Sequence, residues 1–597
     1  MVCGLLLTLG LTGCGPVDPP LPPPPPPSSA PVDLDVGLTS EQSTAWRFTP
    51  EGSDLAPVDI LRAMKDFQTG RLYIDALDHY GFLPSPASPA NPYGLPVGWT
   101  THVPSYAIWD MDFVSINCAA CHTGQLDYAG QSMRIDGGSN MADIEALALS
   151  IKSSAEQMLK DPVETLLFVH RLFHLEPPEY PRTSTADAAA LITGEAGVQA
   201  QVDEPAKDLL SSYVDAAQDG TEDDMDKAAE AFGKACSDII AGKVAEDGPL
   251  TAVVADIHSA VEMAEETRSK VEHMLDVLRD YMALLKNRLQ LAERALTALE
   301  ISQPPGPGRD DPWGIIRNVL FGSGTELDAP TSIPSLYYSR EYVWYHADGN
   351  TNSVMQRDIA QAVALGGFVD PKTGQSSLLP RAIWHLEDLM RTLKSPAWPS
   401  DVFGETDAEK VTQGKALFDQ HCLSCHHSHD GQLMALDEIG TDPNRAESFL
   451  RPQNGMPFYQ ALVQEVEALE NTVYEQAGIS QEEIEKHEYN GPPVWRGTGE
   501  YQSRLLTGIW STAPYLHNGS VPTLYDLLLP VDQRPATFQL GSREYDPVKV
   551  GYVTAANDDS TFTYDITTHG GANTGHEYGI DLSEDERWAL VEYLKTL

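Results

Sequence analysis

The chain is poor in basic residues. Its 39 Lys and Arg stand against 87 Asp and Glu in 597 residues, which gives a formal net charge of −48. A surface this acidic argues against nucleic acid or anionic lipid as a partner. It fits a basic electron donor or a neutral substrate, and it also fits a surface that is merely well solvated.

Cysteine is scarce as well. Four of the seven cysteines form two Cys-x-x-Cys pairs, at 118/121 and 422/425, while Cys3 and Cys14 lie in the apolar N-terminal stretch. Cys236 stands alone, and we expect an ordinary packed thiol there. No cysteine remains for a disulfide framework.

The N-terminal residues predict an export signal. The apolar run 5–11 is too short to span a bilayer, and Leu11-Thr12-Gly13-Cys14 is similar to the bacterial lipoprotein cleavage motif. We therefore expect a signal peptide over 1–14, lipidation of Cys14, and a periplasmic or cell-surface protein that touches the membrane only through its lipid. A non-lipidated signal peptide is the alternative, because the usual Lys or Arg before the apolar run is absent. Residues 15–45 contain six consecutive prolines, which predict a stiff linker.

Each Cys-x-x-Cys pair is followed directly by a histidine. On one helical turn the two cysteines and this histidine share a face, so the thiols can bind a haem while the imidazole reaches its iron. A zinc site or a redox-active dithiol fits a bare pair, but neither explains the histidine after each one. The sequence predicts two covalently bound haem c groups, held by Cys118, Cys121 and His122 and by Cys422, Cys425 and His426.

A chain of this length buries more than one core, and no strong period-2 strand pattern is visible. We expect a mainly α fold with two cytochrome c-like haem domains and long loops. The predicted divisions are an N-terminal haem c domain (46–150), a helical insertion (151–302), an aromatic-rich connecting segment (303–404) and a C-terminal cytochrome c domain (405–597). Within the insertion, apolar residues at three- and four-residue steps over 271–289 predict one long amphipathic helix.

Two helices are predicted beside the second haem. Residues 414–418 precede Cys422, and Gly414 with an apolar face suits packing near a porphyrin edge. The second helix runs from about 582 to 597, with Ser583 and Glu586 as a capping box.

The second haem has a candidate distal ligand. His576 lies between Gly575 and Gly579, in a loop that can approach a flat ring closely, although a surface loop histidine is the alternative. His517 is the second choice, followed by Met434 and Met456. No comparable ligand stands out for the first haem, so we expect its iron, with His122 as proximal ligand, to be the open and reactive one.

Other residues are candidates for roles around the haems. Trp344, Trp384 and Trp510 are candidates for assisting electron transfer, with structural packing as the more common role of such residues. Arg309 is a candidate partner of a haem propionate, or else part of an ion pair in a surface turn.

With both haem motifs, the segment Tyr515-Leu516-His517-Asn518-Gly519 makes the chain resemble the bacterial di-haem cytochrome c peroxidase/MauG superfamily. Segments 332–336, 348–353, 508–514 and 575–579 look like its rubber-oxygenase-like branch. The resemblance covers about 100–150 and 305–597 and leaves 151–302 outside.

The resemblance implies that one haem is the reaction centre and the other relays electrons. In the rubber-oxygenase-like branch the N-terminal haem holds dioxygen and a late histidine closes the second iron. Carried over, His122 is proximal at the active haem, and His426 and His576 are the axial pair of the relay. Peroxidases of the superfamily usually offer a methionine soon after the histidine-containing segment. Residues 525–530 contain none, which favours a bis-histidine relay haem.

Three functions remain open from the sequence. The first is an oxidoreductase activating dioxygen or peroxide, with an apolar polymer or an external electron donor as further partner. The second is a di-haem electron carrier without substrate chemistry of its own. The third is an anchored binding protein in which the helical insertion does the work.

Overall fold

The computed structural model describes residues 30–103, 112–161, 293–428, 431–557 and 560–597, together with Glu164, Leu167, Phe168 and Arg171. The predicted signal peptide, Cys14, Cys236 and the predicted helix over 271–289 lie outside the described residues. Among the helices that are described, none combines the length and the apolar character needed to cross a membrane.

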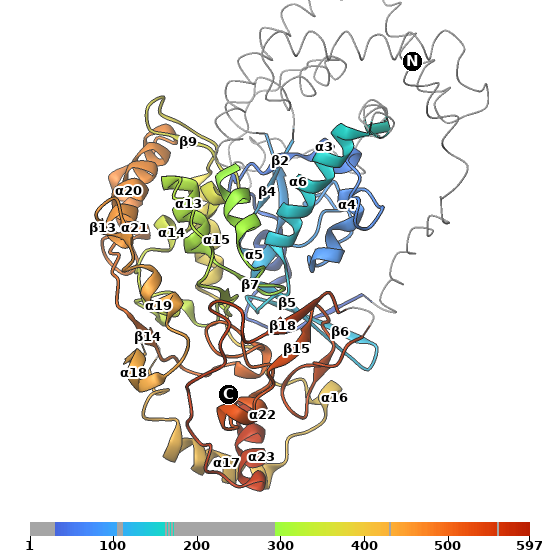
Figure 1. The fold of residues 1–597 in the computed structure, drawn as a ribbon, viewed down its shortest axis with the longest axis vertical. Coiled ribbons are helices and arrows are strands. Elements are labelled where there is room, and N and C mark those ends of the chain that lie inside the picture. The colour runs from blue at the N-terminus through green and yellow to red at the C-terminus, as the bar shows by residue number, and fades with distance from the viewer. Residues whose placement is uncertain are drawn as a thin grey trace, which may run out of the picture.

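The N-terminal part combines two small sheets with short helices around the first haem motif (Figure 1). One sheet has the order β1-β6-β5 and the other β2-β4-β3. The elements are β1 (Val32–Asp33), α2 (Ser40–Phe48), β2 (Ala56–Pro57), α3 (Val58–Ala63), α4 (Tyr73–Ala76), the 3₁₀ helix η1 (Leu77–Tyr80), β3 (Trp99–His102), β4 (Phe113–Ile116), α5 (Cys118–Cys121), β5 (Thr123–Tyr128), β6 (Gln131–Asp136) and α6 (Ile144–Lys160). The folded body thus begins before residue 46.

The middle part packs helices against long loops. Residues 293–301 are helical and lead into β7. The elements are β7 (Arg309–Asp310), α13 (Pro312–Phe321), β8 (Thr331–Ser332), η3 (Ser339–Glu341), α14 (Val354–Ala364), β9 (Val369–Asp370), β10 (Gln375–Ser376), α15 (Pro380–Met390) and α16 (Ser400–Phe403).

The C-terminal part carries the second haem motif at the end of α17. Its elements are α17 (Ala408–His421), β11 (Leu433–Ala435), α18 (Leu436–Ile439), α19 (Asn444–Ser448), β12 (Pro452–Gln453), β13 (Met456–Pro457), α20 (Phe458–Gln476), α21 (Gln481–His487), β14 (Glu500–Gln502), η4 (Ile509–Ser511), α22 (Leu524–Leu527), η5 (Val531–Gln533), β15 (Thr537–Leu540), β16 (Tyr545–Asp546), β17 (Gly551–Tyr552), β18 (Phe562–Asp565) and α23 (Glu584–Leu594).

The prediction of a mainly α fold is wrong. Of the described residues, 39% are helical and 15% lie in strands, which form many small sheets. Most strands are only two to four residues long, which is too short to show an alternating pattern in the sequence. The longest pair, β5 and β6, turns through Ala129 and Gly130, both with positive φ. Alanine is not a typical residue for such a turn, so the hairpin signal was missed.

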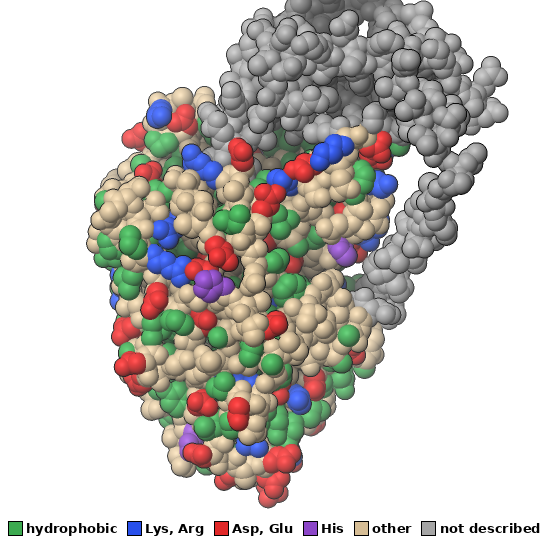
Figure 2. Space-filling model, viewed as in Figure 1, with side chains coloured by type: hydrophobic (Ala, Val, Ile, Leu, Met, Phe, Trp, Pro, Cys, Tyr) green, Lys and Arg blue, Asp and Glu red, His purple; other side chains and the backbone are tan. Residues whose placement is uncertain are grey.

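The helices α17 and α23 pack side by side at the lower end of the view (Figure 1). Both predicted helices are confirmed, and Ser583 and Glu586 form the predicted capping box of α23. The close approach at Gly414 is between the two helices: a Cβ atom there would lie 2.0 Å from the carbonyl oxygen of Ala589. Glycine at 414 is therefore explained by helix packing, without a porphyrin edge. Several acidic side chains lie at this end of the molecule, among hydrophobic, basic and uncharged surface (Figure 2).

One core joins the two ends of the chain. The largest buried cluster contains Trp46 and Cys118 from the N-terminal part and Phe418, Trp510 and Leu590 from the C-terminal part. The two haem motifs therefore border the same buried core.

Candidate haem-binding sites

The first Cys-x-x-Cys-His segment forms a single helical turn, α5. Its N-cap is Asn117, whose side chain accepts from the Ala119 amide (2.9 Å) and donates to the carbonyls of Trp46 (3.1 Å) and Thr49 (2.8 Å). The amide of His122 donates to the Cys118 carbonyl at 2.9 Å. A capped turn of this kind puts both thiols and the imidazole on one face.

The second segment repeats this turn where α17 ends. The amides of Cys425 and His426 both donate to the Cys422 carbonyl, at 3.1 and 3.0 Å. The Ser503 hydroxyl donates to the Cys425 carbonyl at 2.9 Å and so ties the turn to the end of β14.

The two histidines that follow the cysteines are oriented in the same way. Nδ1 of His122 donates to the Pro334 carbonyl (2.8 Å), and Nδ1 of His426 donates to the Arg504 carbonyl. A backbone acceptor at Nδ1 fixes the tautomer and leaves Nε2 as the metal-binding nitrogen. Burial, with Arg357 as a second cause, lowers the pKa of His122 to about 3, and burial also lowers the pKa of His426. Both rings are therefore neutral at neutral pH, as iron ligands must be.

None of the four cysteines of the two segments is in a disulfide. Burial raises the pKa of Cys121 to about 12 and that of Cys422 to about 11, and it raises the pKa of Cys118 as well. Redox-active dithiols have a lowered pKa. No group of three or more His, Cys, Asp or Glu suited to a metal ion occurs among the residues that the structure describes. A dithiol and a zinc site both fit this environment poorly.

His576 lies opposite His426. Their ring centroids are 6.3 Å apart, with an angle of 50° between the ring planes. Burial, followed by the charge of His426, lowers the pKa of His576 to about 4. Among the described residues no second imidazole faces His122 in this way, so the two candidate irons have different surroundings.

The gap between the two rings suits an iron ion. Metal–nitrogen bonds of about 2 Å, with each nitrogen about 1.1 Å from its ring centroid, would place the centroids about 6.2 Å apart if both nitrogens pointed at the metal. The observed separation agrees with this value. The residues present therefore fit a haem held between His426 and His576.

The loop that carries His576 is shaped by its neighbours. A Cβ atom at Gly575 would lie 2.2 Å from the backbone of Gly440, so glycine lets this loop pack against the end of α18. The His576 amide donates to the Ile439 carbonyl at 2.8 Å. The buried guanidinium of Arg534 donates to the carbonyls of Asn573 (2.7 Å), Gly575 (2.9 Å) and His576 (3.3 Å).

The other candidate ligands have different neighbours. Nε2 of His517 is hydrogen-bonded to the Tyr501 hydroxyl (2.9 Å), and the two rings stack at 4.1 Å. Met434 is buried in β11 opposite Tyr501, and Met456 lies in β13. None of the three has a ring or hydrogen-bond contact with His426 among the described residues.

Charged groups near the first haem motif were missed by sequence reasoning. Arg357 and Asp358, an ion pair on α14, influence the pKa of Cys118, and so does Glu51. Arg357 lowers the pKa of both His122 and His346. The available signal was a Gln-Arg-Asp run on a helix whose neighbouring residues are apolar.

Arg309 is buried, which excludes the surface-turn alternative. It donates to the carbonyls of Asn518 (2.8 Å) and Gly519 and lies over the Tyr564 ring at 4.2 Å. It thus holds the loop that contains His517.

The three tryptophans also have packing partners. Trp510 is fully buried in the main core, and Trp384 stacks on His487 at 4.2 Å. The Arg496 guanidinium covers Trp344 at 3.5 Å.

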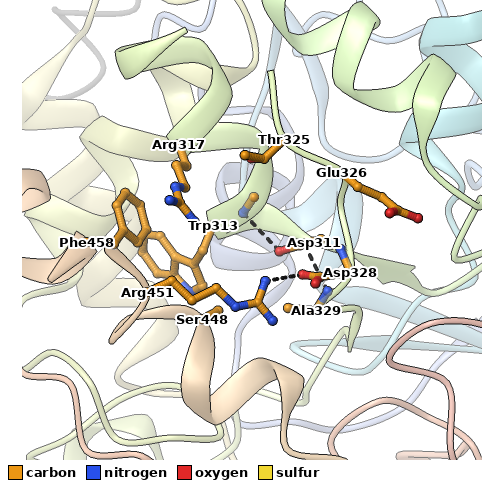
Figure 3. A pocket seen from close by; sticks show the side chains of 11 residues that line it. Asp311, Trp313, Arg317, Thr325, Glu326, Asp328, Ala329, Ser448, Arg451 and Phe458 are labelled. Atoms are coloured by element: carbon orange, nitrogen blue, oxygen red, sulfur yellow. Dashed lines mark hydrogen bonds and ion pairs between the residues drawn. The ribbon is translucent and has the colours of Figure 1, made fainter. Parts of the chain in front are cut away.

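A separate pocket of about 440 Å³ opens beside α13 (Figure 3). Trp313 and Phe458 form its aromatic wall, and Arg451 pairs with Asp328 within it. The Trp313 ring also contacts His346 edge-on at 5.2 Å. The pocket is thus one aromatic ring away from the loop that carries His346.

Comparisons with known proteins agree with this chemistry. Residues 499–539 match a family model described as RoxA-like, cytochrome c-like. The uncharacterized protein y4iJ of Sinorhizobium fredii is 26% identical, with 88% of this chain and 84% of y4iJ covered. The uncharacterized protein y4iM of the same organism is 30% identical over 49% of this chain and 73% of y4iM. This chain belongs to the y4iM family.

Within the y4iM family this chain thus carries a RoxA-like cytochrome c segment, which implies haem c. The matched segment contains Arg504, whose carbonyl accepts from His426. It also contains β14 and His517, which is hydrogen-bonded to Tyr501 of that strand.

Proposed function

We propose that this y4iM-family protein is an exported di-haem c-type cytochrome oxidoreductase. Cys118, Cys121 and His122 would hold the first haem, and Cys422, Cys425 and His426 the second, with His576 as its other axial ligand. The single observation that carries the proposal is the asymmetry between the sites: His426 faces His576 at 6.3 Å, while His122 has no facing imidazole among the described residues. Cys14 would carry the lipid anchor.

Bound at these residues, the haem groups would supply one-electron redox chemistry, and an iron without a second protein ligand would activate dioxygen or peroxide. The protein's part is to orient the imidazoles through the Pro334 and Arg504 carbonyls and to keep them neutral by burial. In this proposal the second haem relays electrons and the first is the reaction centre.

The first experiment tests the asymmetry itself. We expect two haems per chain, one low-spin and one that binds cyanide or, after reduction, carbon monoxide. His576→Ala should turn the low-spin haem high-spin, because its second ligand is lost. His569→Ala removes an exposed histidine nearby and should leave the spectrum unchanged. Two low-spin haems that bind no added ligand would favour the electron carrier instead.

The second experiment separates the two enzymatic chemistries. The pure protein is incubated aerobically with polyisoprene and no donor, and separately with peroxide and reduced cytochrome c. Oxygen uptake with carbonyl products in the first mixture supports an oxygenase acting on an apolar polymer. Oxidation of cytochrome c in the second supports a peroxidase.

A further inference from the structure

Arg504 contacts the second haem motif through its backbone and the loop that carries His346 through its side chain. Its carbonyl accepts from Nδ1 of His426, and its guanidinium donates to the carbonyl of His346 at 2.7 Å. The guanidinium also lies over the Tyr342 ring at 4.9 Å, and its Nε is buried without a partner among the described residues. The orientation of the Arg504 carbonyl toward His426 therefore depends on where the Arg504 guanidinium is held.

The strand before Arg504 is held on both sides in the same manner. The Ser503 hydroxyl donates to the Cys425 carbonyl (2.9 Å). The Gln502 amide donates to the Ala347 carbonyl (2.7 Å). β14 and Arg504 therefore lie between the second haem motif and the loop after His346.

That loop is rigid. Nδ1 of His346 donates to Asn350 Oδ1 (2.7 Å), and the Asn350 amide donates to Asp348 Oδ2 (3.1 Å). Asp348 in turn forms a bidentate, fully buried ion pair with Arg445, at 2.9 and 3.1 Å. A displacement of His346 would have to break this network.

The same chain segment reaches the first haem motif. Pro334, twelve residues before His346, accepts from Nδ1 of His122, and the Leu336 amide donates to the Gly137 carbonyl. The Gly137 amide donates to the His122 carbonyl at 2.7 Å. Segment 334–346 therefore begins at the support of His122 and ends at the contact with Arg504.

We propose that Arg504 is a positioning residue that couples the two haem sites, holding His426 through its carbonyl and segment 334–346, and with it His122, through its guanidinium. This inference rests on the proposed function, since it requires both histidines to be iron ligands. Ligand binding at the first haem and the redox state of the second are then linked, and the linkage is reciprocal.

The test uses Arg504→Gln and Arg504→Lys in the full protein, with Arg496→Gln as matched control. Arg496 donates to the Gly349 carbonyl (2.7 Å) and so holds the same loop, without a contact to the second haem motif. The measurements are the haem content, the midpoint potential of the second haem and the cyanide affinity of the first.

In Arg504→Gln the hydrogen bond to His426 weakens, so the imidazole becomes less basic and the second haem's midpoint potential rises. We expect cyanide affinity at the first haem to change about fivefold or more, the lower range of site-to-site coupling. The midpoint potential and cyanide affinity of Arg504→Lys should lie between those of Arg504→Gln and wild type. Both values of Arg496→Gln should match wild type.

Unchanged values in Arg504→Gln, a change at one haem alone, or an equal change in Arg496→Gln would each overturn the coupling. Failure of the proposed function is seen separately, in the wild-type protein, as fewer than two haems or as a second haem without two histidine ligands.

Discussion

Glu387 is buried at a position where a charged carboxylate is unfavourable. It lies on α15 with 5% of its surface exposed, and its Oε2 has no hydrogen-bond partner among the described residues. Burial raises its pKa from 4.5 to about 8, the nearby Asp358 adds to the rise, and Arg391 opposes it. Glu387 is therefore protonated in the folded protein at neutral pH.

The direction of the pH effect follows from this pKa. Above pH 4.5 the unfolded chain releases the proton, whereas the folded protein keeps it until about pH 8. Stability therefore falls as the pH rises between these values, by about 3 kcal/mol at pH 7, about 4 kcal/mol at pH 8 and about 5 kcal/mol well above pH 8. Glu387→Gln has the same shape and no proton to lose, so it should remove this loss.

The assay is urea unfolding of the haem-loaded wild type and Glu387→Gln at pH 5, 7 and 8. We expect nearly equal free energies of unfolding at pH 5 and a growing advantage of the variant toward pH 8. Glu482→Gln, at an exposed position of α21, is the matched control and should show no such trend. An advantage of Glu387→Gln that is the same at all three pH values would refute the reasoning.

Three further substitutions test other buried groups. Asp348→Asn leaves the Arg445 guanidinium buried without a carboxylate, and the free energy of unfolding in urea should fall by about 3–5 kcal/mol; a fall below about 1 kcal/mol would contradict this. Burial and Arg445 lower the pKa of His517 from 6.5 to about 3. The free energy of unfolding of the wild type should therefore fall by up to about 5 kcal/mol as the pH is lowered through this range. In the same acid titration, the free energy of unfolding of His517→Gln should fall by correspondingly less. Arg534→Gln removes the donors to the loop that carries His576, so the second haem should become partly high-spin. An unchanged low-spin spectrum would show that this loop keeps its conformation without Arg534.

Local features could be predicted from the sequence because the residues that cause them lie within a few positions of one another. The capping box of Ser583 and Glu586 is a short-range pattern, and α23 begins where it predicted. The spacing of Cys118, Cys121 and His122 predicted a helical turn, and α5 is one. His576 was singled out for the glycines around it, and one of them, Gly575, lets the loop pack against the end of α18.

The short strands and the carbonyls that orient His122 and His426 could not be predicted from the sequence, because their partners are distant along the chain. β1 pairs with β6 a hundred residues later, and two-residue strands leave no periodic pattern. Nothing local marks Pro334 or Arg504 as supports of the proximal histidines, since only their backbone carbonyls make those contacts. A carbonyl is present at every residue, so its role depends entirely on where the chain folds.

The sequence alone predicted which residues would hold haem, because covalent attachment needs cysteines and a histidine at fixed spacing on one turn. It also singled out His576 as the ligand to examine. The three-dimensional fold was needed to show that the ring centroids of His426 and His576 lie 6.3 Å apart, and that segment 334–346 runs from the contact with His122 to the contact with Arg504. Those relations depend on packing between residues dozens to hundreds of positions apart, which no local pattern encodes.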